Sequence, residues 1–265
     1  MPVSPYASPF SGTAEYYARH RAPYAPAALD WVAECFALTS MDQVLDLGCG
    51  PGTLAIPLAR RVAEVVAVDP DAAMIGEGRR LAELESQRNI RWLAVRAEDV
   101  PIDKGSFRLA TIGQAFHWMD RDSVLARLAV LIADGGGLAL VNPGRRRPQE
   151  SWEETAHSIV AKFLGPPIRH PKSNPREPEH ETALRRSASF SHFTAREFPG
   201  AVTRDIASII GFVYSVSWSA RPLFGGRTEA FEAELSTALQ RLNPTGVFEE
   251  RVETEVLIAP KQSRP

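Results

Sequence analysis

The sequence predicts an α/β fold in which a doubly wound, mostly parallel sheet of seven strands carries helices on both faces. Segments with the composition of buried strands alternate with helical segments through the first half of the chain, and this alternation is typical of a parallel sheet. The first strand ends in a turn with Gly48, Gly50 and Gly52 at alternate positions. Glycine lets the backbone take positive φ and approach a ligand closely, so we expect a ligand at this turn.

Five strands are predicted before residue 142 and two after it. Runs of apolar strand-forming residues mark the first five at 44–47, 64–69, 90–96, 107–113 and 138–141. The two later strands are expected at 193–198 and 251–258. Apolar residues at helical spacing predict helices near 11–21, 26–36, 53–61, 71–84, 120–132, 152–163, 206–218 and 228–242.

We expect four segments along the chain. Residues 1–40 form an N-terminal flap and helix, 41–142 the binding core, 143–191 an insertion or lid rich in proline and arginine, and 192–265 a completion of the sheet with helices. Irregular chain as long as the insertion is usually a functional loop or a disordered one. Its basic residues suit a carboxylate or phosphate on the substrate, and a solvated cationic lid is the alternative; they are Arg145, Arg146, Arg147, Arg169, Lys172 and Arg176.

Composition excludes several classes of function. The 265 residues are 44% apolar and carry a formal net charge of −2, so the chain can bury a core and has no basic field for nucleic acid. The two cysteines, Cys35 and Cys49, suggest neither a disulfide framework nor a thiolate metal site. No apolar run is long enough to span a bilayer. We therefore expect a cytoplasmic monomer or homodimer without a metal ion, a nucleic-acid partner or a membrane.

Candidate binding residues follow the first four strands. Ligands on parallel sheets bind at the carboxyl ends of the strands, and this edge receives Asp46 with the glycine turn, Asp69, Glu98, Asp99 and residues 114–118. Asp69 lies 17 residues after Gly52, where a carboxylate accepts hydrogen bonds from the two hydroxyls of a ribose. The alternative is that Asp69 only stabilises the dipole of the helix that follows it.

Four motifs in register resemble a known family. They are Asp46-x-Gly48-x-Gly50-x-Gly52, Asp69, Ala97-Glu98 and Gln114-Ala-Phe-His-Trp118, after the first, second, third and fourth strands. Together they resemble class I S-adenosylmethionine-dependent methyltransferases, most closely the small-molecule branch of methyltransferase type 11 and trans-aconitate methyltransferase-like proteins. The segment Tyr16-Tyr-Ala-Arg-His-Arg-Ala-Pro-Tyr24 is similar to that branch too. The resemblance covers residues 11–142.

The resemblance implies a Rossmann-like methyltransferase fold and an enzyme that methylates an oxygen, nitrogen or carbon of a small-molecule acceptor. The cofactor would be S-adenosyl-L-methionine and the product S-adenosyl-L-homocysteine. By this resemblance Gly48, Gly50 and Gly52 lie against the methionyl part of the cofactor, Asp46 lies near its ammonium group, and Asp69 holds the ribose hydroxyls.

The resemblance also implies roles for residues outside the glycine turn. Ala97 and Glu98 would flank the adenine, and Gln114 would line the methyl-donor end. Tyr17 and Arg19 would close over the cofactor from the N-terminal flap. Methyl transfer from a sulfonium needs mainly alignment of the acceptor and exclusion of water, and orientation alone supplies on the order of 7–11 kcal/mol in favourable cases.

His117 is the candidate catalytic residue. It is the one histidine expected at the carboxyl edge of the sheet, where it would serve as a base for a phenol or amine acceptor. A carboxylate acceptor needs no base. The alternative is that His117 and Trp118 are only packing residues of the loop after the fourth strand. A titratable group with a perturbed pKa indicates a functional site in some proteins and a structural role in others.

Two other classes of protein share parts of this pattern. A nicotinamide-dependent oxidoreductase also has a strand, a glycine turn, a helix and a later aspartate, but its fingerprint places the third glycine one position beyond Gly52. A regulatory protein that binds S-adenosylmethionine without catalysis would keep the same pocket. The sequence leaves the identity of the acceptor open, because a fold does not fix a substrate.

Overall fold

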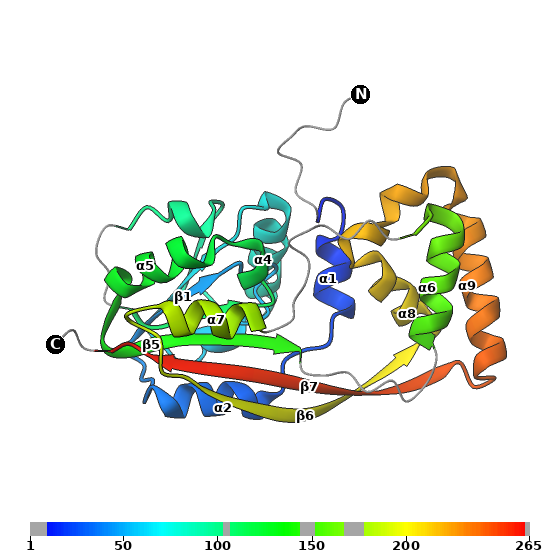
Figure 1. Ribbon diagram of the computed structural model, residues 1–265. Helices are drawn as coiled ribbons and strands as arrows, with labels where there is room; N and C mark the ends of the chain where they lie inside the picture. Colours follow the sequence, from blue (N-terminus) through cyan, green and yellow to red (C-terminus); the bar gives the residue numbers. More distant parts are fainter. Residues whose placement is uncertain (1–9, 103–106, 144–151, 167–177, 263–265) are drawn as a thin grey trace. The chain divides into compact units, whose positions relative to one another are not determined.

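The computed structural model describes residues 10–102, 107–143, 152–166 and 178–262 (Figure 1). The chain divides into two compact units. The sheet unit contains the described residues of Tyr24–Gly144, Pro171–Phe198 and Glu253–Pro265, and the helical unit contains those of Met1–Pro23, Arg145–His170 and Pro199–Val252. Most of the site residues expected from the sequence therefore belong to the sheet unit.

In the part of the chain that the structure describes, one sheet has seven strands in the order β3-β2-β1-β4-β5-β7-β6. Strands β3, β2, β1, β4 and β5 run parallel to one another, and β7 runs antiparallel to β5. The mostly parallel α/β sheet predicted from the sequence is confirmed. Its strands are β1 (Gln43–Leu47), β2 (Glu64–Val68), β3 (Ile90–Leu93), β4 (Phe107–Gly113), β5 (Ile132–Pro143), β6 (Thr194–Asp205) and β7 (Val247–Pro260).

Helices cover both faces of the sheet, so its strands bury residues on both sides. Val44 of β1 belongs to one apolar core and its neighbour Leu45 to the other, as the alternation of side chains along a strand requires. The first core includes residues of α2 (Pro26–Cys35), α3 (Ala55–Ala59) and α4 (Ala72–Leu84), and the second includes residues of α5 (Arg121–Leu131) and α7 (Pro178–Arg186). The short 3₁₀ helices η1 (Ala97–Asp99) and η2 (Phe116–Trp118) follow β3 and β4.

The strand register brings the loops after β1, β2 and β4 to one edge of the sheet. Leu47 at the end of β1 lies beside Val68 of β2 and Ile112 of β4. Parallel strands that end in register release their loops on the same side of a sheet. The turn after β1 and the loops after β2 and β4 therefore start next to one another.

The helical unit has an aromatic core. It contains α1 (Ala14–His20), α6 (Trp152–Leu164), α8 (Ile206–Tyr214) and α9 (Thr228–Leu242), with η3 (Ser217–Ser219) and η4 (Arg221–Arg227). The rings of Phe224 and Phe231 are 4.1 Å apart between centroids. Arg204 and Glu250 form a buried ion pair of 2.7 Å, and a second N–H of Arg204 donates to the His20 carbonyl at 2.8 Å.

Two elements differ from the expectation. Residues 178–186 form α7, although the proline-rich composition around them predicted irregular chain. A proline at the first helical position loses no hydrogen bond, and the acidic first turn and basic last turn of α7 complement the helix dipole. Strand β5 begins at Ile132 and runs through Gly135–Gly137, ahead of the strand expected at 138–141. A Cβ at Gly137 would lie 2.5 Å from the Phe36 ring, so glycine allows this close approach of α2.

We predict that Leu128→Ala lowers the free energy of unfolding by about 2–5 kcal/mol, because it removes a fully buried side chain from the core between α5 and the sheet. The matched control is Leu84→Ala in α4, where the side chain is 71% exposed and the expected change is within about 0.5 kcal/mol. Chemical denaturation measures both. Equal losses in the two variants would contradict the assignment of this core.

Candidate functional site

The glycine turn leaves β1 at Gly48 and packs against the loop after β4. The φ angles of Gly48, Gly50 and Gly52 are 65°, 53° and 88°, a region that residues with a side chain rarely adopt. A Cβ at Gly48 would lie only 2.3 Å from the Cβ of Ala115. Glycine is therefore required here both by the backbone conformation and by the closeness of the neighbouring loop.

Asp69 fixes the middle of the turn. Its Oδ2 accepts a hydrogen bond of 2.9 Å from the Gly50 amide, and its Oδ1 accepts one of 2.8 Å from the Asp71 amide. Burial raises the pKa of Asp69, and these two bonds oppose the shift. A Cβ at Gly50 would meet no atom within 4 Å, so the space beside the Gly50 Cα is open. Each carboxylate oxygen retains a lone pair for a further donor.

Asp46 at the end of β1 and Cys49 in the turn are both buried. Asp46 is completely buried, and its Oδ1 accepts a 2.8 Å hydrogen bond from the Thr111 hydroxyl. Burial raises the pKa of Asp46 to about 7, although bonds from Thr111 and the Ala55 amide oppose the shift. The Cys49 amide donates to the Val68 carbonyl at 3.0 Å, and burial raises the pKa of its thiol. The expected contact of Asp46 with a ligand ammonium stays a prediction.

Ala97 and Glu98 form the start of η1, after β3. Ala97 is buried. Glu98 accepts hydrogen bonds from the Asp120 amide at 3.0 Å and from Arg96 Nε at 3.3 Å. Burial raises the pKa of Glu98, but these bonds outweigh it and the pKa is lowered. An ionised Glu98 thus ties the loop after β3 to the start of α5.

Gln114 directly follows β4 and has a φ of 53°. Non-glycine residues in this region cluster at functional sites, because the strain persists only where the surroundings enforce it. The Gln114 amide donates to the Val141 carbonyl at 3.1 Å, and its side-chain Nε2 donates to the Tyr24 hydroxyl at 3.3 Å. Sequence reasoning assigned no role to Tyr24, which closes the segment Tyr16 to Tyr24 that resembles the family.

His117 lies in η2, three residues beyond Gln114. Its Nδ1 is buried and has no hydrogen-bond partner in the described structure. Burial, aided by the charge of Arg121, lowers the pKa of His117 to about 4. The imidazole is therefore neutral at pH 7. Its ring is 5.2 Å from that of Trp118 between centroids, so the two residues are also in contact.

Tyr17 and Arg19 belong to α1 in the helical unit. Arg19 forms an ion pair of 2.9 Å with Glu15, and both side chains are more than half exposed, a type of pair that contributes little to stability. The guanidinium of Arg21 stacks over the Tyr17 ring at 5.0 Å. Closure of these residues over a ligand stays a prediction.

The sheet edge thus combines an open glycine turn, a carboxylate fixed beside it and the loops after β3 and β4. Hydroxyl groups that meet Asp69 would find a charged acceptor, and charge-assisted hydrogen bonds are about twice as strong as neutral ones. At Gly50 the turn leaves open space beside its backbone. This arrangement fits a ligand with a ribose next to an extended, polar chain.

Comparison with known proteins identifies the same region. Residues 44–136 match the model of a family described as "Methyltransferase domain". An uncharacterized methyltransferase of Mycobacterium tuberculosis (strain ATCC 25618 / H37Rv) is 32% identical over 160 residues, which cover 60% of this chain and 61% of the relative. The ubiquinone biosynthesis O-methyltransferase of Acinetobacter baumannii (strain AYE) is 31% identical over 113 residues, or 42% and 48% of the two chains. This chain therefore spans about three fifths, or less, of the curated relatives it matches.

Solved structures share the fold. A putative type II methyltransferase from Anaeromyxobacter dehalogenans is 25% identical with a TM-score of 0.61, covering 91% of this chain and 97% of the other. A SAM-dependent methyltransferase from Thiobacillus denitrificans in complex with S-adenosyl-L-homocysteine has a TM-score of 0.53 at 16% identity, covering 95% and 98%. Among the helices that the structure describes, none has the length and apolar character needed to cross a membrane.

We predict that Asp46 makes the protein less stable as the pH rises from about 4 to about 7. Its pKa is about 7 in the folded protein and about 3.9 when unfolded, so the unfolded state binds fewer protons in this range and unfolding becomes easier with rising pH. The effect has an upper bound of about 4 kcal/mol for three pKa units.

Denaturation at several pH values checks this on wild type and on Asp46→Asn. The variant is expected to lose this part of the pH dependence, because the amide does not ionise. The same substitution at the exposed Asp99 controls for removal of a carboxylate in general. A parallel pH dependence in wild type and Asp46→Asn would show that Asp46 is not the group responsible.

Proposed function

We propose that this chain, which belongs to the class I S-adenosylmethionine-dependent methyltransferases, transfers the methyl group of that cofactor to an oxygen, nitrogen or carbon of a small-molecule acceptor. The observation that supports this most directly is the bond between the Gly50 amide and the Asp69 carboxylate, beside an open turn. It would provide a ribose-binding group at the place where the family binds its cofactor.

The residues present fit the cofactor. Gly50 leaves the space that a side chain would fill, and Gly48 allows the loop of Ala115 to approach. Asp69 would hold the ribose hydroxyls, Ala97 and Glu98 would flank the adenine, and the glycine turn would contact the methionyl part. Asp46 would lie near the ammonium group of the cofactor, and its carboxyl group is held by the bond from Thr111.

S-adenosylmethionine, when bound, supplies a methyl group already activated on a sulfonium. What remains for the protein is to hold the acceptor in line and to exclude water. Gln114, fixed by Tyr24 and by the Val141 carbonyl, would line this end of the site. His117 is neutral at pH 7 and therefore able to take a proton, but a pKa of about 4 makes it a weak base. This favours an acceptor atom that is already ionised.

The test of the function is turnover. The purified chain is incubated with S-adenosylmethionine and a panel of carboxylic acids, phenols and amines, and formation of S-adenosylhomocysteine and of the methylated product is measured. Product formation supports the enzyme. Tight binding of S-adenosylhomocysteine without turnover on any acceptor would favour a regulatory binding protein, and binding of NADH instead would contradict the proposed cofactor.

We predict that Asp69→Ala weakens S-adenosylhomocysteine binding at least tenfold, because the ribose loses a charged acceptor. Asp69 also holds two backbone amides, so the loss alone does not separate ribose binding from damage to the turn. The 2′-deoxy analogue of the ligand separates them. Wild type should bind the analogue several-fold more weakly, and Asp69→Ala should bind both ligands alike.

Calorimetric titration measures the four affinities. Asp134→Ala, which removes an exposed carboxylate near the start of β5, is the matched control and should bind like wild type. If Asp69→Ala still distinguishes the ligand from its 2′-deoxy analogue as well as wild type does, Asp69 does not hold the ribose.

A further inference from the structure

Helix α7 is held on the sheet unit by a contact that contains two histidines. His180 of α7 is 1% exposed, and its ring lies 5.2 Å from the Phe116 ring and 6.4 Å from the His117 ring of η2 between centroids. One turn further along α7, Ala183 and Leu184 are buried in the same apolar core as Phe116. The imidazole of His180 is therefore part of the packing between α7 and η2.

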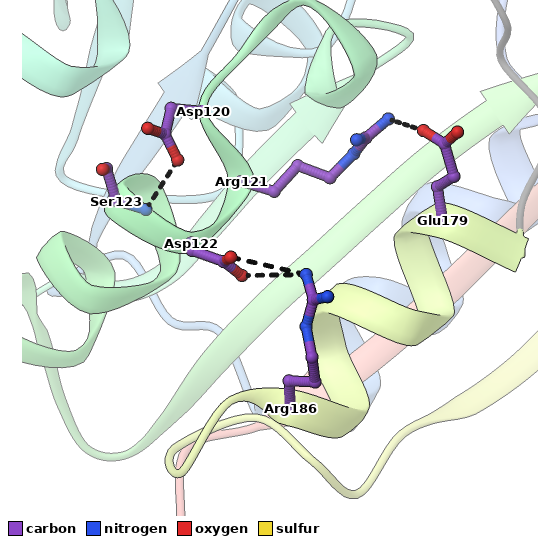
Figure 2. A network of polar contacts seen from close by, with 6 residues as sticks. All are labelled: Asp120, Arg121, Asp122, Ser123, Glu179 and Arg186. Carbon is purple, nitrogen blue, oxygen red and sulfur yellow. Dashed lines mark hydrogen bonds and ion pairs between the residues drawn. The ribbon is translucent and has the colours of Figure 1, made fainter.

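Two ion pairs join α7 to the start of α5. Figure 2 shows Arg121 paired with Glu179 at 2.9 Å, and Asp122 paired with Arg186 at 3.4 Å. Three of these four side chains are more than half exposed, so the pairs contribute little to stability. The buried contact around His180 therefore decides whether α7 stays in place.

The other charged groups nearby have partners of their own. Asp120 of the α5 start accepts a hydrogen bond from the Ser123 amide (Figure 2). Glu181 and Arg185 of α7 pair with each other at 3.1 Å. The guanidinium of Arg121 lies 5.9 Å from the centre of the Phe116 ring. A positive charge thus lies close to the two imidazoles, and the carboxylates around them are engaged elsewhere.

The buried imidazole nitrogens have no acceptor. In the described part of the chain, Nδ1 of His117 and both ring nitrogens of His180 have no hydrogen-bond partner. Most buried polar groups in native proteins are hydrogen-bonded, so three unpartnered nitrogens together require an explanation. A neutral ring at such a place loses only hydrogen bonds to water, whereas an imidazolium would bury a charge without compensation, which costs far more. The contact therefore accepts these rings in their neutral form only.

Proton uptake is coupled to this contact. Burial lowers the pKa of both His117 and His180 to about 4, and the charge of Arg121 adds to the effect. With α7 detached both rings would reach water, where the pKa of a histidine is about 6.5. Between pH 4 and pH 6.5 the detached form thus binds more protons than the closed form. A fall in pH through this range favours detachment.

The rest of the sheet unit does not need α7 in order to stay folded. Among the described residues, the first apolar core, with α2, α3 and α4, contains no residue of α7. What α7 covers is η2, where His117 follows Gln114 by three residues. The Met119 methyl group, next after η2, lies 3.1 Å from where a Cβ of Gly48 would stand. Release of α7 would uncover the loop that packs against the glycine turn.

We propose that α7 is an acid-released cover over η2. It stays closed while His117 and His180 are neutral, and it detaches when solvent protons bind to their rings, because the buried contact cannot hold the added charge. Detachment is local, so β1, β2 and the helices of the first core remain folded. The proposal concerns the sheet unit alone and does not depend on the proposed function.

Amide hydrogen exchange on the full chain tests this, measured at pH 7 and pH 5 and corrected for the intrinsic effect of pH on exchange. One histidine whose pKa is about 4 in the closed form and about 6.5 in the detached form gives about a twentyfold change between these pH values. We expect the amides of α7 to exchange at least tenfold faster at pH 5, and those of β2 and α4 to change less than threefold.

Variants assign the effect to the two rings. His117→Gln and His180→Gln should each reduce the ratio of the α7 rates at pH 5 and pH 7, and the double variant should lose it, because glutamine takes up no proton. The ratio is the readout because a loss of packing raises both rates alike. Glu179→Gln removes a surface ion pair and should raise both rates without reducing the ratio. His192→Gln, which removes an exposed histidine of the sheet unit, should change neither.

Three results would overturn the proposal. The α7 rates would not rise at pH 5, or β2 and α4 would follow them, which would indicate general unfolding. In the third case the double variant would keep the ratio of wild type, or Glu179→Gln would lose it, and the pH dependence would then come from another group.

Discussion

The hydrogen bond from the Gly50 amide to Asp69 is the contact on which the binding edge depends. It exists because β1 and β2 run parallel with Leu47 beside Val68, so that the first residue beyond β2 reaches the third residue of the turn after β1. With this bond made, the turn is held at positive φ and the carboxylate is fixed beside open space. A short side chain thus determines both the shape of the turn and the charge that a ligand meets.

The sheet and the turn were predictable from the sequence because their causes are local. Three patterns determine the structure within a few residues of where they occur. They are the runs of apolar strand formers, the glycines at alternate positions and the carboxylate after the second strand. The position of Asp69 follows from the same rule, since the end of a strand is set by its composition. Resemblance to a family then supplied roles for these positions, which local patterns alone do not provide.

The partners that complete the site were not predictable, because they depend on contacts between distant parts of the chain. Tyr24 meets Gln114 across 90 residues, and His180 meets His117 only because α7 packs on the face of the sheet that carries α5. The proline-rich composition around 165–180 predicted irregular chain, so the start of α7 was not predicted. The strain at Gln114 is likewise a property of the folded loop, and glutamine itself gives no signal of it.

The burial of Cys49 has a consequence for the chemistry of the turn. Cys49 lies between Gly48 and Gly50, two glycines of the proposed cofactor turn, yet it is only 5% exposed and the pKa of its thiol is raised. The thiolate is the reactive form of cysteine, so oxidants and alkylating reagents find almost none of it while the turn is closed. Such a reagent should therefore label Cys49 more slowly than the exposed Cys35.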